Sequence, residues 1–365
     1  MSTSYLIGVF LLTFCLAVIL TWLVSKLAKA LKIMDYPDNH RKLHTTPVPL
    51  LGGVGIFLAF FTVLFLVHDK IAQILANSPH PYSWLGVFFG GLLLMIGGWL
   101  DDKYNLKPKW QLIWPILATL CVVLGGIGIN KVSGGSAGDF VYLNTWQIPL
   151  FFWHGSWHYF VLLSDGFTIL WLLGMMYTTK LLDGLDGLVS GLSAIAGLII
   201  FLFTMTTQYY QPDIGLAALI FAAAACGFLV FNWHPAKIFL GEGGSLFVGF
   251  ILGVLSIISG GKIAIALLIM GIPILDAFWT IIRRILAGVN PFKTSDRRHL
   301  HHRLLDFGLS VPQVALIFYI LAAFFGLTTL FLQSSGKILI LACLAILTMI
   351  GLVILAKLDK KSKIS

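Results

Sequence analysis

Long apolar stretches divide this chain, and they constrain its fold more than any other feature. A helix needs roughly 20 apolar residues to cross about 30 Å of hydrocarbon, and unbroken apolar runs exclude a β-barrel, whose strands alternate. The expected spans are Tyr5–Val24, Leu50–Val67, Trp84–Leu100, Leu112–Ile129, Tyr159–Tyr177, Leu188–Met205, Ile214–Phe231, Ser245–Ser259, Ile263–Ile281, Val314–Phe331 and Ile338–Ala356. The sequence therefore predicts an all-α polytopic integral membrane protein, one domain over residues 1–365, with eleven or ten spans.

Composition excludes the main soluble alternatives. Only 11% of the residues are charged and 58% are apolar, whereas soluble domains carry about 25% charged residues. The sequence contains no Walker A motif, and no GxGxxG opens a helix after a strand, so an ABC ATPase and a Rossmann enzyme are excluded as well. The segment from Asn130 to His158 is rich in Gly, Ser and aromatic residues, which favours an interfacial hairpin or a short helix at headgroup level.

Basic residues set the expected orientation. With the amino terminus outside, only Lys70, Lys131, Lys262 and Lys337 of the 24 basic residues fall outside, which leaves 20 in cytoplasmic segments. The positive-inside rule then places the carboxyl terminus in the cytoplasm. This asymmetry and attraction to anionic lipids explain the net charge of +9, so membrane lipids are expected partners and nucleic acid is not.

Carboxylates collect at the same membrane face. Asp101 and Asp102 directly follow the third apolar stretch, and Asp183 and Asp186 are spaced to share one helix face next to glycines. Glu242, the only glutamate of the chain, stands among glycines at the start of the eighth stretch. A carboxylate beside lipid costs free energy unless it is paired, hydrated or metal-bound. Solvated charges at a helix end, or a capped helix start, are the structural alternatives for the two aspartate pairs.

Basic residues and histidines join these carboxylates. The run DRRHLHHRL holds three histidines between arginines and suits phosphate binding; a positive-inside loop would explain its arginines but not its histidines. The site is expected to form from cytoplasmic loops at about residues 35–53, 101–110, 178–188, 232–245 and 287–312. Carboxylates for Mg²⁺ and basic residues for phosphate indicate metal-assisted phosphoryl transfer between a soluble and a bilayer-anchored substrate.

Five motifs, in this order, carry a resemblance to a known family: RKLHTTPVPLLGG, GWLDDKYNLKPKWQL, DGLDGL, FNWHPAKIFLGEGGS and DRRHLHHRL. The chain resembles the polyprenyl-phosphate N-acetylhexosamine-1-phosphate transferases of glycosyltransferase family 4. The resemblance implies a transferase that moves a sugar 1-phosphate, with GlcNAc favoured, from a UDP-sugar to undecaprenyl phosphate and releases UMP. Mg²⁺ would be required, with Mn²⁺ as a substitute. The enzyme would work at the cytoplasmic face of a bacterial plasma membrane, in the first membrane step of cell-surface polysaccharide synthesis, and a homodimer is left open.

The resemblance also assigns roles to individual residues. Asp101 and Asp102 would lie near the lipid phosphate, Phe239 would stack on uracil, and the histidines would lie near the diphosphate. The residues assigned to catalysis are Asp101, Asp102, Asp186, His299, His301 and His302. The residues expected to bind substrate, from the resemblance or from their own charge and position, are Lys42, His44, Lys180, Asp183, Asn232, Phe239, Arg297 and Arg298. Those assigned to the metal are Asp101, Asp102, Asp183, Asp186 and Glu242.

Two departures from the family pattern stand out. The family usually has NxxN before DGLDGL, and Tyr177 and Lys180 occupy these positions here. Glu242 replaces an aspartate, and we expect it to remain an Mg²⁺ ligand. Asp276 fits the GlcNAc branch but could equally serve helix packing. The alternative functions are a phospho-N-acetylmuramoyl-pentapeptide transferase, a secondary transporter whose acidic residues relay ions, and a non-catalytic membrane scaffold.

Overall fold

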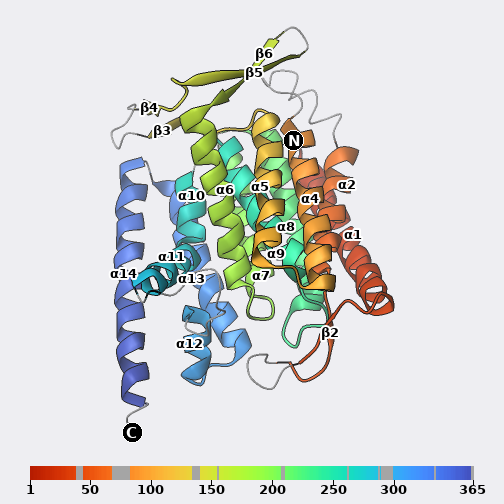
Figure 1. The fold of residues 1–365 in the computed structure, drawn as a ribbon, viewed down its shortest axis with the longest axis vertical. Helices are drawn as coiled ribbons and strands as arrows, with labels where there is room; N and C mark the ends of the chain where they lie inside the picture. Colours follow the sequence, from red (N-terminus) through yellow and green to blue (C-terminus); the bar gives the residue numbers. More distant parts are fainter. Residues whose placement is uncertain are drawn as a thin grey trace.

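The structure is a computed structural model that describes residues 1–37, 44–67, 83–133, 140–153, 156–206, 210–260, 263–286, 288, 299–332 and 334–362. Its helices pack side by side into a bundle with the two chain ends at opposite ends of the long axis (Figure 1). The helices in these ranges are α1 (Thr3–Ala30), α2 (Gly52–Leu66), α4 (Ser83–Tyr104), α5 (Pro108–Leu124), α6 (Leu162–Leu182), α7 (Leu188–Thr204), α8 (Pro212–Asn232), α9 (Gly241–Ile258), α10 (Ile263–Ile269), α11 (Gly271–Leu286), α12 (Leu300–Asp306), α13 (Val311–Phe331) and α14 (Ser334–Ser362). Lys42, Arg297 and Arg298, predicted to bind substrate, lie outside the described residues.

The prediction of a helical, multi-pass membrane protein is confirmed. Each expected apolar stretch falls mostly on a helix or, for the ninth, on a helix pair, and the fifth, Tyr159–Tyr177, begins in the strand Ser156–Val161 before α6. Five described helices are long and apolar enough to cross a bilayer, namely α1, α4, α8, α9 and α13, and the bent pair α10 and α11 makes six. Four shorter apolar helices are α2, α5, α7 and the segment Ser335–Gly351 of α14. The count of eleven crossings therefore stays a prediction.

The prediction that the ninth stretch, Ile263–Ile281, forms a single helix is wrong. It breaks into α10 and α11, which bend by 82°, and α11 lies across the bundle axis in Figure 1. Pro273 has no N–H to donate to the carbonyl of Ile269, so α10 cannot continue, whereas a proline is tolerated in the first turn of α11. An apolar run alone does not reveal such a break.

Short strands connect some of the helices and depart from a purely α fold. They form three antiparallel pairs. The strands are β1 (Met34–Asp35), β2 (Val48–Pro49), β3 (Lys131–Ser133), β4 (Phe140–Tyr142), β5 (Gln147–Trp153) and β6 (Ser156–Val161). The aromatic segment before α6 thus forms a hairpin, one of its two expected forms, because its β-branched and aromatic residues suit strands. It lies at the end of the bundle opposite α12 (Figure 1).

Helices α8 and α9 form the core, and glycines let α9 approach its neighbours closely. Both helices are buried over most of their length. A Cβ on Gly244 would lie 2.7 Å from the Cα of Gly53, and one on Gly243 would lie 3.3 Å from the Cα of Gly98. Real Cβ atoms do not come as close as 2.7 Å to another carbon. The start of α9 is thereby held against α2 and the end of α4, where the acidic motifs meet.

Candidate active site

The two aspartates that end α4 have different surroundings. Asp101 accepts hydrogen bonds from the N–H of Leu106 at 2.8 Å and from Nε2 of Gln111 at 3.0 Å. Asp102 accepts one from the N–H of Glu242 at 3.1 Å through Oδ1. Its Oδ2 is buried and has no hydrogen-bond partner within the described part of the chain. Asp101 is therefore held in place by protein groups, while Asp102 keeps a free carboxylate oxygen.

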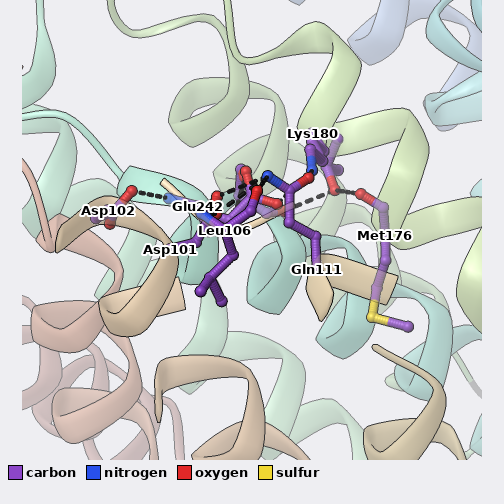
Figure 2. Close-up of polar contacts among 9 residues, drawn as sticks. Asp101, Asp102, Leu106, Gln111, Met176, Lys180 and Glu242 are labelled. Atoms are coloured by element: carbon purple, nitrogen blue, oxygen red, sulfur yellow. Dashed lines mark hydrogen bonds and ion pairs between the residues drawn. The ribbon is translucent and has the colours of Figure 1, made fainter. Parts of the chain in front are cut away.

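Lys180 belongs to a chain of polar contacts that joins four helices. It lies in the last turn of α6, forms an ion pair with Glu242 of α9, and donates to Oε1 of Gln111 at 3.3 Å. Gln111 belongs to α5 and contacts Asp101 of α4, so one chain of polar contacts runs from α4 through α5 and α6 to α9 (Figure 2). Lys180, predicted to bind substrate, is therefore paired with a predicted metal ligand in this structure.

Asp183 and Asp186 lie in the turn between α6 and α7, so the expectation that they share one helix face is wrong. Gly187 adopts a left-handed conformation, φ +76°, and ends the turn as the N-cap of α7. Burial raises the pKa of Asp183 to about 8, helped by repulsion from Glu242, Asp102 and Asp186. Three neighbouring carboxylates are thus close enough to oppose the ionisation of Asp183.

Asp186 fastens this turn to the loop before α9. Its Oδ2 lies 2.7 Å from Nδ1 of His234 and accepts the N–H of Ala236 at 3.1 Å. Asn232 makes a second connection, because its buried amide accepts from Gly187 N–H at 3.1 Å and donates to the carbonyl of Ile238 at 3.0 Å. Asn232, predicted to bind substrate, is placed where it orders the two loops.

His44 and Phe239, both predicted to bind substrate, lie side by side. Their ring centroids are 5.3 Å apart in an edge-to-face arrangement. The N–H of Phe239 donates to the carbonyl of Pro49, and the N–H of Gly52 donates to that of Phe239, each at 2.9 Å. These backbone bonds join the first basic loop to the loop before α9 and leave the Phe239 ring half-buried.

The histidine motif is anchored by Asp276, whose role the sequence left open. One carboxylate oxygen of Asp276 lies 2.8 Å from Nδ1 of His299, and the other accepts the N–H of Leu300 at 3.1 Å. Asp276, in α11, therefore orients the first imidazole and satisfies a backbone donor at the start of α12. Both Asp276 and His299 are buried.

The other two imidazoles face the DGLDGL turn. His301 stacks on His299 with centroids 5.7 Å apart, and His302 lies 4.3 Å from His301. A Cβ on Gly184 would lie 2.9 Å from Nε2 of His301 and 3.1 Å from Nε2 of His302. Burial, together with the neighbouring imidazoles, lowers the pKa of His301, so its ring is neutral at pH 7. Glycine is needed at 184 for this approach.

The donor set fits a hard divalent cation. Asp102, Asp183 and Glu242 offer carboxylate oxygens, the ligands that Mg²⁺ prefers. No three His, Cys, Asp or Glu side chains of the described residues are already clustered as a metal centre. The Oδ2 of Asp102 is nevertheless buried and unpartnered among the described residues, and burial raises the pKa of Asp183, so Lys180 does not neutralise these two carboxylates.

Three residues of the site had no role assigned from the sequence. Gln111 joins Asp101 to Lys180, His234 binds Asp186, and Asp276 holds His299. Gln111 and His234 both lie within motifs singled out in the sequence, and each is polar at the edge of an apolar stretch. That position was the available signal.

Comparison with known proteins supports the reading of the motifs. The profile of glycosyl transferase family 4 matches residues 84–260. The chain is 31% identical to the probable undecaprenyl-phosphate N-acetylglucosaminyl 1-phosphate transferase of Bacillus subtilis, over 89% of this chain and 84% of that protein. It is 30% identical to an undecaprenyl-phosphate alpha-N-acetylglucosaminyl 1-phosphate transferase of Thermotoga maritima, over 78% of this chain and 76% of that protein.

A relative of the alternative branch is similar to the same degree. The phospho-N-acetylmuramoyl-pentapeptide-transferase of Bacillus pumilus is 32% identical, over 78% of this chain and 82% of that protein. All three relatives match along most of their length, and the family profile covers the aspartate motifs and Glu242. The chain therefore belongs to glycosyl transferase family 4 and is a membrane phosphoglycosyltransferase.

Proposed function

We propose that the protein transfers GlcNAc-1-phosphate from UDP-GlcNAc to undecaprenyl phosphate and releases UMP. The observation that carries this proposal is the meeting of four motifs at one end of the bundle. Carboxylates and the imidazoles of His301 and His302 lie next to the DGLDGL turn. Asn232 joins this turn to the loop that carries the half-buried Phe239. The names of the Bacillus subtilis and Thermotoga maritima relatives support the donor and the acceptor.

The chemistry is a displacement at phosphorus. An oxygen of the lipid phosphate attacks the sugar-bearing phosphorus of the donor, and the bond to the UMP oxygen breaks. A lipid phosphate has a second pKa of about 6, so it is already mostly deprotonated at pH 7, and no strong base is required. Bound Mg²⁺ would offset the repulsion between the two polyanions.

The protein residues divide the remaining tasks. Asp102, Asp183 and Glu242 would hold the metal, since Asp102 Oδ2 is unpartnered among the described residues. Asp101 has both oxygens engaged by Gln111 and acts in positioning. Neutral His301 can donate one hydrogen bond to a phosphate oxygen without the cost of a buried charge. Phe239 would stack on the uracil.

The proposed setting is the plasma membrane of a bacterium. We propose eleven crossings in one domain, with the amino terminus outside and the active site in the cytoplasm. Opposite chain ends in Figure 1 agree with an odd number of crossings. The motif-bearing α12 and the β5–β6 hairpin also lie at opposite ends of the bundle, as this topology requires.

The acceptor lipid and the donor sugar can be tested together. Purified protein in detergent is given undecaprenyl phosphate, Mg²⁺ and either UDP-GlcNAc or UDP-MurNAc-pentapeptide, and UMP release is measured. We expect turnover with UDP-GlcNAc, none with the pentapeptide donor, and none in EDTA. The identities to the two branches, 31% and 32%, do not separate the donors, so this comparison decides between them. Inactivity with every UDP-N-acetylhexosamine would contradict the proposal.

A further inference from the structure

We infer that Lys180 is a built-in counter-ion that occupies the acidic site before the metal arrives and competes with the divalent cation for Glu242. This inference rests on the proposed function for its reaction, but it concerns the substrate-free protein. It assigns Lys180 a regulatory task in metal loading, in addition to any contact with substrate phosphate.

The contacts place the ammonium group inside the acidic cluster. Lys180 forms an ion pair with Glu242, whose own N–H bonds Asp102. Asp183 lies close enough to Glu242 and Asp102 for their charges to raise its pKa. Of the Lys and Arg side chains in the described ranges, Lys180 alone pairs with one of the carboxylates Asp101, Asp102, Asp183 or Glu242.

The surroundings of Lys180 hold it in place without closing the site. Gln111 is fixed by two bonds to Asp101 and one to the carbonyl of Leu106, so its Oε1 points at the ammonium. The ring centroid of Tyr177, about one turn earlier on α6, lies 5.6 Å from Nζ. Both Gln111 and Tyr177 remain available to Lys180 after it leaves Glu242, because neither contact involves that carboxylate.

Competition follows from the charges. A metal that binds Glu242 places two positive charges beside an ammonium group that contacts the same carboxylate, and like charges disfavour one another. This repulsion weakens the contact between Lys180 and Glu242 when the metal binds, so the free energy of the ion pair is subtracted from metal affinity. The displaced ammonium then lies next to the metal, where an incoming diphosphate offers it new acceptors.

The test is a Mn²⁺ titration of substrate-free protein in detergent, followed by electron paramagnetic resonance of free Mn²⁺. We expect Lys180→Met to bind Mn²⁺ at least tenfold more tightly than the wild type and Lys180→Arg, which keeps the charge, to bind like the wild type. Glu242→Gln should bind more weakly. Lys29→Met, which removes an exposed lysine of α1, controls for net charge and should leave binding unchanged.

Turnover supplies a second readout that damage to the fold would not imitate. Lys180→Met should lower kcat for UMP release at saturating Mg²⁺ while it binds metal more tightly, whereas a misfolded site would lose both. If Lys180→Met does not fold, Lys180→Gln is titrated instead. Equal or weaker Mn²⁺ binding by the neutral variant, or no binding by either protein, overturns the inference. If Lys180→Met binds Mn²⁺ more tightly than the wild type but the wild type turns over no UDP-sugar, the inference stands and only the proposed function is refuted.

Discussion

Replacing Asp276 by asparagine tests how the histidine motif is held. Asparagine has nearly the same shape, so Oδ1 can still accept the N–H of Leu300, 3.1 Å away in the wild type. Its amide group, however, faces Nδ1 of His299, where a carboxylate oxygen lies at 2.8 Å. Two donors then meet unless His299 changes its tautomer and moves its proton to Nε2. The substitution thus reverses which side of the imidazole can donate to a substrate.

The size of the effect follows from the bond that is lost. A hydrogen bond to a charged group contributes about 1.5–3 kcal/mol, and each 1.36 kcal/mol changes a rate about tenfold. If His299 acts on the substrate in the transition state, kcat for UMP release should fall by about 10- to 150-fold, with little change in the KM for the UDP-sugar. The fold should persist, because one of the two bonds to Asp276 survives.

The assay compares three substitutions. Asp276→Asn is measured by steady-state UMP release and by thermal unfolding in detergent, next to Asp276→Ala and the control Asp213→Asn near the start of α8. The alanine variant leaves a buried N–H and an imidazole nitrogen unpaired, and each unpaired group destabilises the fold by about 1–3 kcal/mol. The Tm of Asp276→Ala should therefore fall well below that of Asp276→Asn. If Asp276→Asn stays within twofold of wild-type kcat while His299→Ala is severely impaired, the orienting role of Asp276 is refuted.

Other substitutions probe the packing, the charge and the nucleotide contact of the site. Gly244→Ala forces α9 away from α2, which should destabilise the fold by about 1–3 kcal/mol and lower its Tm. Gly174→Ala is the control and should leave Tm unchanged, because nothing lies within 4 Å of its new Cβ. Equal Tm values for the two variants would contradict the close approach. With the pKa of Asp183 raised to about 8, the folded, metal-free protein holds a proton that the unfolded chain releases at its ordinary pKa of about 4. Its Tm should therefore fall as pH rises from 5 to 9, and Asp183→Asn should flatten this slope. Phe239→Ala should raise the KM for the UDP-sugar about tenfold, since stacking on a base is worth about 1–3 kcal/mol, and Phe239→Trp should keep a near-wild-type KM; an unchanged KM in the alanine variant would remove Phe239 from the nucleotide site.

The sequence predicted the helices and the clustering of the motifs, because both follow from local patterns. Each apolar stretch required a helix, and the charges of the motifs had to face the same side of the membrane. The break between α10 and α11 was missed, although Pro273 marks it, because proline is tolerated in many membrane helices. The turn at Asp183 and Asp186 was missed for a related reason, since a spacing of three suits a helix until a glycine ends it.

Contacts between distant helices could not be predicted, because they depend on how the helices are rotated against each other. Asp276 and His299 are 23 positions apart, and Gln111 and Lys180 are 69 positions apart. Nothing in one chain's sequence states which of several polar residues meet across a helix interface. Only the packed structure shows that Asp101 is engaged by Gln111 while Asp102 keeps an unpartnered oxygen.

Lys180 and Glu242, the two departures from the family pattern at charged positions, turn out to be one interaction. Viewed along the sequence they are 62 positions apart and unrelated, and each alone would disturb the site. Lys180 adds a positive charge where the resemblance leads us to expect an asparagine, and Glu242 extends its carboxylate by one methylene beyond the expected aspartate. In the structure the longer acid reaches the ammonium, and the two changes offset each other's charge. The site therefore keeps its carboxylate at this position and also carries a cation of its own, and a change at either position has to be interpreted together with the other.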